Sequence, residues 1–249
     1  MMPARPAGIR LYRPGGPLSL ALLLLLAANP ARGQDSWAGS VGFATDNVYR
    51  GLSMTAGRPA WLTDIHRSFG EHWTAGLAAS AERPAYQHAG AQLTAYLQRH
   101  WLVGDDWALQ AAVAFHDSPW NRYRNQARYS EASLAVGFRG RWNASIAISP
   151  DYTGYYTGRR DNGGTVVWLE SNLEQPLSDR LSAQIGAGHA ESSAARMVDY
   201  SYASAGLRLD LAPLYLFVSW IHTTPVRAYY GHPLPRRNRW VGSAIWTFR

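Results

Sequence analysis

Cysteine and lysine are both absent from this sequence of 249 residues. Without cysteine, the chain has no disulfide framework, no thiolate metal site and no lipid-modified N-terminal cysteine. Its fold must therefore be held by hydrogen bonding and packing alone. Because lysine is absent, all 24 basic residues are arginine, whose planar guanidinium can bind a phosphate through two parallel N–H bonds.

Long apolar runs are missing beyond residue 33. A transmembrane helix needs about 20 apolar residues in succession, so membrane-spanning helices are excluded there. The apolar run from Leu18 to Ala28 is shorter and follows three arginines, Arg5, Arg10 and Arg13. This order is typical of a signal peptide. Small residues at Ala31 and Gly33 predict cleavage after residue 33, so residues 1–33 are a signal peptide and residues 34–249 form one domain.

A large excess of charge is lacking once the leader is set aside. The formal net charge is +7, but four arginines lie within residues 1–33, which leaves +3 on the mature chain. So small a charge gives no reason to expect a nucleic acid partner. The eight histidines are scattered and lack the spacing of a known metal motif, so neither a metal nor another cofactor is predicted.

What is present is an alternation of apolar and polar residues with period two, which predicts β-strands. It is clearest over residues 91–98 and 107–116, where Leu, Val and Phe alternate with Gln, Thr and Ala. About twelve such strands are predicted. They lie near residues 37–44, 60–69, 73–82, 91–98, 107–116, 131–139, 142–148, 167–174, 181–188, 200–209, 214–223 and 240–249.

Short turns alternate with longer loops along this series. The turns lie near Gly70, Gly104, Gly140, Pro176 and Asp210. An even number of strands with short turns on one side and longer loops on the other is the plan of an outer-membrane barrel. The predicted fold class is therefore all-β, an antiparallel up-and-down transmembrane β-barrel of twelve strands in the cell outer membrane.

The last strand supports a lipid-facing barrel wall. Trp240, Trp246 and Phe248 share one parity, with small residues between them. Aromatic side chains at both ends of one strand face suit the two membrane interfaces. This strand is expected to close the barrel by pairing with the strand that begins at Trp37, and the barrel-assembly machinery is an expected partner. A soluble sandwich or lipocalin-like barrel would also alternate, but its outer face would have to be polar.

The opposite strand face carries polar and charged residues that a dry core would not tolerate. The lumen candidates are Glu82, Glu131, Arg139 and Glu170. In the first loop, Asp46 and Arg50 have the parity opposite Val41, so both are expected to point into the lumen. Two interpretations remain open, since a polar lumen needs paired charges either way: a charged constriction that selects solutes, or an ion-pair network that braces the barrel.

A family resemblance lies in this first loop. Thr45-Asp-Asn-Val-Tyr-Arg-Gly-Leu-Ser53, followed by Arg58-Pro-Ala60, resembles the opening motif of the TorF-type porins of proteobacteria. Trp168-Leu-Glu-Ser-Asn-Leu173 is similar to a second stretch of that family. The resemblance implies an outer-membrane β-barrel that forms a pore, without an established substrate.

Arginine is concentrated in or beside the outer loops. These residues are Arg122, Arg124, Arg128, Arg159, Arg160, Arg227, Arg236, Arg237 and Arg239. They could draw anions toward the barrel mouth or bind lipopolysaccharide phosphates, or they could be solvated loop charge. The hypothesis is a porin-like channel for small polar or anionic solutes with a narrow charged lumen.

Two other functions are alternatives to the channel. One is a lipid-modifying hydrolase that uses His189-Ala-Glu-Ser-Ser193 or His116-Asp-Ser118, although neither stretch matches a known lipase or deacylase motif. The other is a closed structural barrel. No catalytic residue is predicted, and the channel is preferred.

Overall fold

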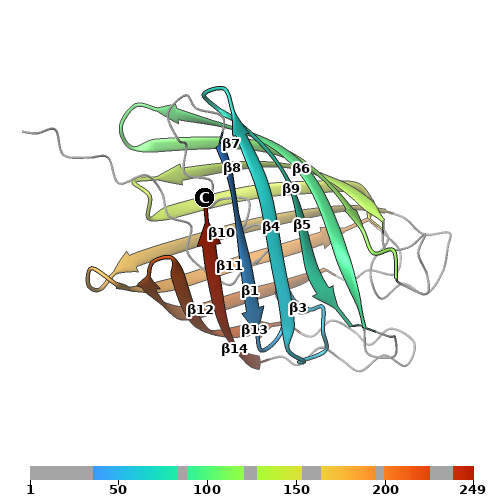
Figure 1. Ribbon diagram of the computed structural model, residues 1–249. Coiled ribbons are helices and arrows are strands. Elements are labelled where there is room, and N and C mark those ends of the chain that lie inside the picture. The colour runs from blue at the N-terminus through green and yellow to red at the C-terminus, as the bar shows by residue number, and fades with distance from the viewer. Residues whose placement is uncertain (1–35, 84–88, 121–127, 153–163, 194–198, 225–237) are drawn as a thin grey trace, which may run out of the picture.

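The computed structural model describes residues 36–83, 89–120, 128–152, 164–193, 199–224 and 238–249. Twelve strands form one closed barrel (Figure 1). They are β1 (Ser36–Ala44), β4 (Ala60–Phe69), β5 (Trp73–Glu82), β6 (Gly90–Val103), β7 (Trp107–Asp117), β8 (Tyr129–Phe138), β9 (Trp142–Tyr152), β10 (Gly164–Pro176), β11 (Leu181–Ser192), β12 (Tyr200–Leu211), β13 (Leu214–Thr223) and β14 (Asn238–Phe248). No helix in these ranges is long and apolar enough to cross a membrane.

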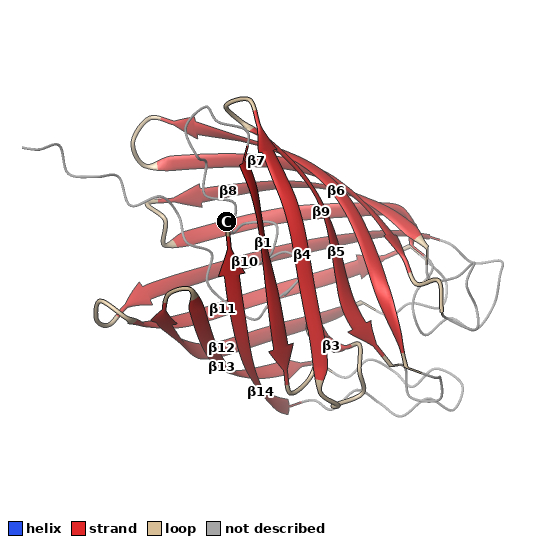
Figure 2. Cartoon of the chain, viewed as in Figure 1, coloured by secondary structure: helices blue, strands red, loops and turns tan. Residues whose placement is uncertain are grey.

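Each strand pairs antiparallel with its neighbours in sequence, and β14 closes the barrel against β1 (Figure 2). In the closing seam Val41 lies opposite Trp246, and on the other side of β1 it lies opposite Thr63. A closed sheet leaves no unpaired strand edge in lipid, where an unpaired backbone group is costly. The predicted twelve-stranded antiparallel barrel is confirmed. The strands β6 and β10 extend several residues beyond their predicted ends.

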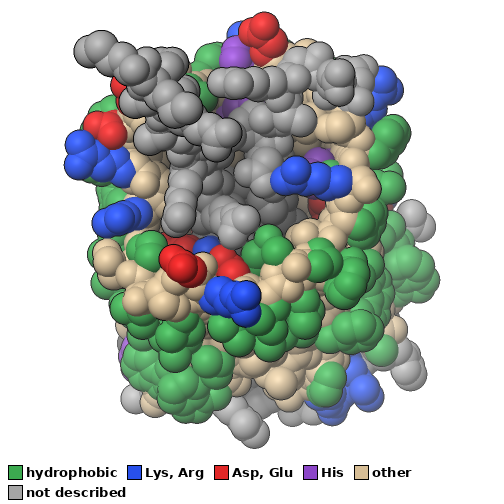
Figure 3. All heavy atoms as spheres, turned by 60° about the vertical axis from the view of Figure 1, so that its left-hand side comes forward, with side chains coloured by type: hydrophobic (Ala, Val, Ile, Leu, Met, Phe, Trp, Pro, Cys, Tyr) green, Lys and Arg blue, Asp and Glu red, His purple; other side chains and the backbone are tan. Residues whose placement is uncertain are grey.

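The outer wall is apolar and exposed, as a lipid-facing surface requires. Trp240, Trp246 and Phe248 of β14 are 70%, 50% and 44% exposed. At the short-turn end, Trp37, Trp73 and Trp107 stand at or beside the starts of their strands and face outward. Figure 3 shows apolar side chains over this wall and charged side chains around the rim. In a soluble protein these side chains would be buried, so the exposed belt identifies the wall that faces the membrane.

The inner wall is polar over most strands, but β13 also turns large apolar side chains inward. Ile221 of β13 packs against Val241 of β14 and against Val48 of the first loop. Phe217, four residues before Ile221 in β13, packs with Ala44, Leu62 and Ile245. The strand is apolar on both faces because one face meets lipid and the other meets a segment that folds into the barrel.

That segment is the first loop, which the sequence predicted only as a loop. It contains two short strands, β2 (Val48–Tyr49) and β3 (Leu52–Ser53), joined by Arg50 and Gly51. Both turn residues are left-handed, with φ of 47° and 78°. Two left-handed residues form the turn that suits a two-residue hairpin. We call residues 48–53 the Arg50 hairpin.

One predicted lumen residue lies elsewhere. Arg139 was expected to face the lumen at the end of the sixth predicted strand, but β8 ends at Phe138 and Arg139 begins the following turn with a φ of 50°. Its side chain is 63% exposed, and its Nε donates to Asp106 Oδ1 at 3.0 Å. The prediction of Arg139 as a lumen residue is wrong because the strand parity does not extend into the turn.

Candidate functional site

The Arg50 hairpin lies inside the barrel near the end that carries the longer loops, and Asp46 organises its base. The Asp46 Oδ1 accepts hydrogen bonds from Ser53 Oγ at 2.5 Å, from Thr55 Oγ1 at 2.9 Å and from the Gly57 backbone N–H at 3.3 Å. Arg239 of β14 donates to Asp46 Oδ2 at 3.4 Å. The structure thus places Asp46 inside the barrel, where its carboxylate holds the first loop in shape. None of these hydrogen bonds joins Asp46 to the residues around the hairpin tip.

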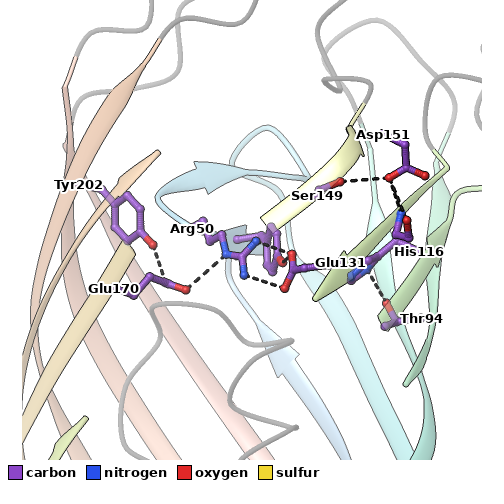
Figure 4. Close-up of polar contacts among 10 residues, drawn as sticks. Arg50, Thr94, His116, Glu131, Ser149, Asp151, Glu170 and Tyr202 are labelled. Atoms are coloured by element: carbon purple, nitrogen blue, oxygen red, sulfur yellow. Dashed lines mark hydrogen bonds and ion pairs between the residues drawn. The ribbon is translucent and has the colours of Figure 1, made fainter. Parts of the chain in front are cut away.

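At the hairpin tip, the Arg50 guanidinium reaches two carboxylates from different strands. Nη1 and Nη2 donate to the two oxygens of Glu131 at 2.6 and 2.9 Å, and Nε donates to Glu170 Oε2 at 3.3 Å. Figure 4 shows the guanidinium held between these two glutamates. The Arg50 side chain is 1% exposed. The pair with Glu131 is bidentate, which is the geometry that makes an arginine–carboxylate contact strong and directional.

These contacts cross the barrel. The hairpin is covalently attached between β1 and β4, which are neighbours in the closed sheet. Glu131 belongs to β8 and Glu170 to β10, and these two strands flank β9 on the opposite side of the strand order. The Arg50 side chain therefore connects opposite walls, and the lumen is narrowed at this level by both the hairpin and its ion pairs.

Aromatic rings line the wall around the guanidinium. Arg50 lies over the Trp168 ring at 4.2 Å and the Tyr49 ring at 4.9 Å from their centroids. From Trp168 the rings continue around the inner wall through Tyr152 at 5.2 Å and on to Tyr129 at 4.8 Å between centroids. A cation over aromatic faces is stabilised most when water is excluded, as it is here.

The charge state of Arg50 follows from these neighbours. Burial by itself would lower the pKa of the guanidinium, but the carboxylates of Glu131 and Glu170 and the Tyr49 ring oxygen raise the Arg50 pKa well above its ordinary value. The burial of Tyr49 raises its own pKa, so its phenol stays neutral. The tip of the hairpin therefore carries a permanent positive charge.

Residues that the sequence did not single out hold the tip in place. Thr223 Oγ1 donates to the Gly51 carbonyl at 2.7 Å. A Cβ on Gly51 would lie 2.6 Å from the Tyr202 Cβ, so only glycine fits there. The Tyr202 hydroxyl donates to Glu170 Oε1 at 2.5 Å.

To reach Glu170 on β10 from β12, the Tyr202 ring passes over Gly188 of the intervening strand β11. A side chain at position 188 would collide with this ring. The sequence marks this arrangement through the glycine, which leaves room for a neighbouring side chain. It gave no sign of which aromatic residue would cross it, because that depends on the pairing of Gly188 with Tyr202 across two strands.

On the side that faces β4, β5 and β6, the first loop packs less completely against the barrel wall. Asn47 donates to the Ala81 carbonyl at 2.8 Å and to Ser80 Oγ at 3.3 Å. Beside these contacts, a cavity of about 20 Å³ separates the loop from the β4–β6 wall and is lined in part by Gln92 and Thr94. A cavity of this size holds a water molecule. This cavity lies between the first loop and the wall formed by β4, β5 and β6.

The remaining predicted site residues are not gathered at the tip. Glu82 is buried at the end of β5, on the same wall as Asn47's partners. The outer-loop residues Arg122, Arg124, Arg159, Arg160, Arg227, Arg236 and Arg237 lie outside the described residues. Arg128 is described and donates to Asp117 at 2.9 Å. The role predicted for the outer-loop arginines stays a prediction.

The two hydrolase candidates do not assemble a catalytic array in the described structure. His116 faces the lumen, where its Nδ1 lies 3.0 Å from Thr94 Oγ1, while Asp117 pairs with Arg128. His189 faces outward, and Ser201 Oγ, not Glu191, lies 2.9 Å from its Nδ1. Within the described ranges, no three His, Asp or Glu side chains are grouped so that they could hold a metal ion.

Comparison with known proteins gives a structural likeness and no sequence relative. No protein-family model matches the chain, and no curated protein matches it. The NanC porin is similar in structure with a TM-score of 0.57 and 9% identity, over 85% of this chain and 99% of that one. The COG4313 outer membrane channel from Pseudomonas putida F1 is similar with a TM-score of 0.50 and 12% identity, over 88% of this chain and 97% of that one.

At these identities the likeness shows the fold alone, and that fold is the outer-membrane β-barrel. It agrees with the exposed apolar wall and with the closed strand order. The similar structures are a porin and a channel, and membership of the TorF-type family is a finer prediction that they do not test.

Proposed function

We propose that this protein is a porin-like outer-membrane channel for small polar solutes, in which the Arg50 hairpin forms the constriction. The observation that carries the proposal is the ion-pair bridge from Arg50 to Glu131 and Glu170 across the barrel. Charged side chains at the narrowest level of a pore decide which solutes enter. The hairpin makes such a level, and a cavity large enough for a water molecule lies between it and the β4–β6 wall.

The balance of charge in the lumen favours cations. The buried charged side chains of the described ranges include six carboxylates, Asp46, Asp64, Glu82, Glu131, Glu170 and Glu174, against three guanidiniums, Arg50, Arg208 and Arg239. An excess of one sign inside a low-dielectric wall attracts the opposite ion. Anionic solutes were predicted from the outer-loop arginines, and that part of the prediction depends on residues outside the described ranges.

The family proposal rests on the same segment. Thr45–Ser53, which resembles the opening motif of the TorF-type porins, is the stretch that forms the hairpin and its base. Its most specific residues, Tyr49, Arg50 and Gly51, are those at the constriction. Lipopolysaccharide at the outer loops and the barrel-assembly machinery at β14 remain proposed partners.

Planar-bilayer recording of the refolded protein tests the channel. We expect discrete conductance steps with a reversal potential that shows cation preference in a salt gradient. We expect Arg50→Ala to raise the conductance of each step, because the bridge is removed, and to increase the cation preference, because two carboxylates lose their partner. A wild-type barrel that never conducts, together with an Arg50→Ala barrel that never conducts, would overturn the proposal.

A closed structural barrel is the second candidate, and the complete burial of Arg50 with two partners favours it. In that case the bridge only braces opposite walls. Arg50→Ala would then lower the free energy of unfolding while neither protein conducts. The two candidate functions therefore predict different conductance but the same loss of stability in Arg50→Ala. Both quantities have to be measured on the same preparations.

A further inference from the structure

The outer wall carries an arginine where lipid is expected. Arg99 of β6 has the parity of Leu93 and Leu97, which are exposed on the outer wall, while the neighbouring Gln98 is buried in the lumen. An arginine on the lipid face is unfavourable in the middle of the membrane and tolerated near its interfaces. The position of Arg99 therefore has to be explained.

Two tryptophans place Arg99 at an interface. Its guanidinium carbon lies 5.2 Å from the Trp73 ring centroid and 5.0 Å from the Trp101 ring centroid. Trp73 is the first residue of β5, directly after the short turn that follows β4, and it lies opposite Arg99 across the strand pair. Short turns of outer-membrane barrels face the periplasm, and tryptophans at that rim lie at headgroup level. Arg99 is therefore at the level of the periplasmic-leaflet headgroups.

The charge of Arg99 has no protein counter-ion in the part of the chain that the structure describes. Other strand arginines have one: Arg208 pairs with Glu174 and Asp210, and Arg239 pairs with Asp46. Arg99 forms no such pair, and its Nε is buried without a hydrogen-bond acceptor. On the other side of Arg99, its partner across β6 and β7 is the small residue Ala111. The guanidinium is therefore held by aromatic rings, and no carboxylate of the described residues pairs with it.

The geometry points to Arg99, between Trp73 and Trp101, as a binding site for the phosphate of an anionic phospholipid in the periplasmic leaflet. A guanidinium that lies over aromatic rings keeps its two terminal Nη groups for a phosphate, which accepts two parallel hydrogen bonds. The tryptophans would cover the upper acyl chains and the glycerol region, as interfacial aromatics do. The same arc carries a second outward arginine, Arg67 of β4, opposite Trp37 of β1. This site is independent of whether the lumen conducts.

The test is lipid retention by the whole refolded barrel. The protein is stripped of lipid in a neutral detergent, titrated with phosphatidylglycerol, and examined by native mass spectrometry for bound lipid. Phosphatidylcholine and inorganic phosphate are titrated in parallel. We expect phosphatidylglycerol to be retained, phosphatidylcholine to be retained less, and phosphate at millimolar concentration not to displace the lipid.

The variants separate the Arg99 site from general charge. Arg99→Gln should weaken phosphatidylglycerol retention roughly tenfold, as expected for the loss of a charged hydrogen-bond pair. Arg139→Gln is the matched control, because it removes an exposed arginine from a turn at the same end of the barrel, and it should leave retention unchanged. Arg99→Lys keeps the charge without the planar fork, and it should bind more weakly than wild type and more tightly than Arg99→Gln.

Three outcomes would overturn the proposal. Retention by Arg99→Gln equal to wild type would remove Arg99 from lipid binding. Equal retention of phosphatidylcholine would remove the preference for an anionic lipid, and displacement by inorganic phosphate would make the site one for a free anion. If Arg99→Gln fails to fold, Arg99→Lys carries the comparison, and wild-type retention by that variant would count against the planar, stacked arrangement.

Discussion

The two halves of the lumen differ in how their charged side chains are paired. In the half near the longer loops, Arg50 joins a hairpin rooted at β1 and β4 to Glu131 and Glu170 on the opposite wall. In the half near the short turns, Arg208 of β12 pairs with Glu174 of β10, only two strands away. One network crosses the barrel and the other stays on one side of it.

The difference lies in the covalent connection. A side chain on a strand reaches its neighbours along the wall, as Tyr96 of β6 does when it passes over Gly76 of β5 to donate to Asp64 of β4 at 2.8 Å. Only a segment that leaves the wall can bring a charge to the far side. The Arg50 hairpin is that segment, so a bridge across the lumen and a narrow level in it arise together, whereas wall pairs leave the lumen unbridged.

Among the substitutions that test this difference, Arg50→Ala is expected to have the largest effect on stability and conductance. It removes one counter-ion from the buried carboxylates of Glu131 and Glu170, and removal of one partner of a buried pair costs about 3–5 kcal/mol. We expect this loss in the free energy of unfolding, measured by urea titration in lipid vesicles, together with a changed conductance. Arg58→Ala is the control, because Arg58 is exposed in the same loop and should change neither quantity.

Arg208→Ala is the counterpart in the other half. It removes the arginine that pairs with Glu174 and Asp210, so the loss of unfolding free energy should also approach about 3 kcal/mol. The conductance should change much less than in Arg50→Ala, because no bridge across the lumen is removed. If Arg208→Ala and Arg50→Ala shift single-channel conductance equally, the distinction between bridging and wall pairs is wrong.

Two glycines of the first loop form a matched pair of substitutions, for which an intermediate loss of stability is expected. Gly51 and Gly57 have nearly the same φ, +78° and +76°, but a Cβ would meet Tyr202 at position 51 and nothing within 4 Å at position 57. Gly57→Ala should cost about 1 kcal/mol from backbone strain alone, and Gly51→Ala should cost about 1–3 kcal/mol more because the tip must move. Unfolding in urea measures both. Equal losses would show that the tip is not fixed against β12.

The smallest expected effect comes from two tyrosines that cross glycines in the two halves. Tyr202→Phe removes the donor to Glu170, and Tyr96→Phe removes the donor to Asp64. Each should lower the free energy of unfolding by about 1–2 kcal/mol, because a buried carboxylate loses one hydrogen bond. Only Tyr202→Phe should also change current noise in bilayer recordings, since Glu170 is part of the bridge. Noise changes of the same size in Tyr96→Phe would contradict this.

Strand positions could be predicted because they depend on local pattern. The alternation over residues 107–116 and the glycines at the short turns indicate where strands lie and which face meets lipid, and the outward side chains of β14 are those that the sequence indicated. Arg139 could not be placed in this way, because the pattern does not mark where a strand stops and a turn begins. The apolar inner face of β13 could likewise not be explained from the sequence, because Ile221 on that face packs against Val48, which is remote in sequence.

A twelve-stranded barrel with an apolar outer face, a charged lumen and a first loop that carries Arg50 follows from the sequence, because period two and turn residues act between neighbours in the chain. The inward folding of that loop as a hairpin, and the contacts of Arg50 with Glu131 and Glu170, follow from the three-dimensional fold. Closure of the sheet brings strands that are distant in sequence to opposite walls, and which side chains then meet depends on the register of every strand pair between them.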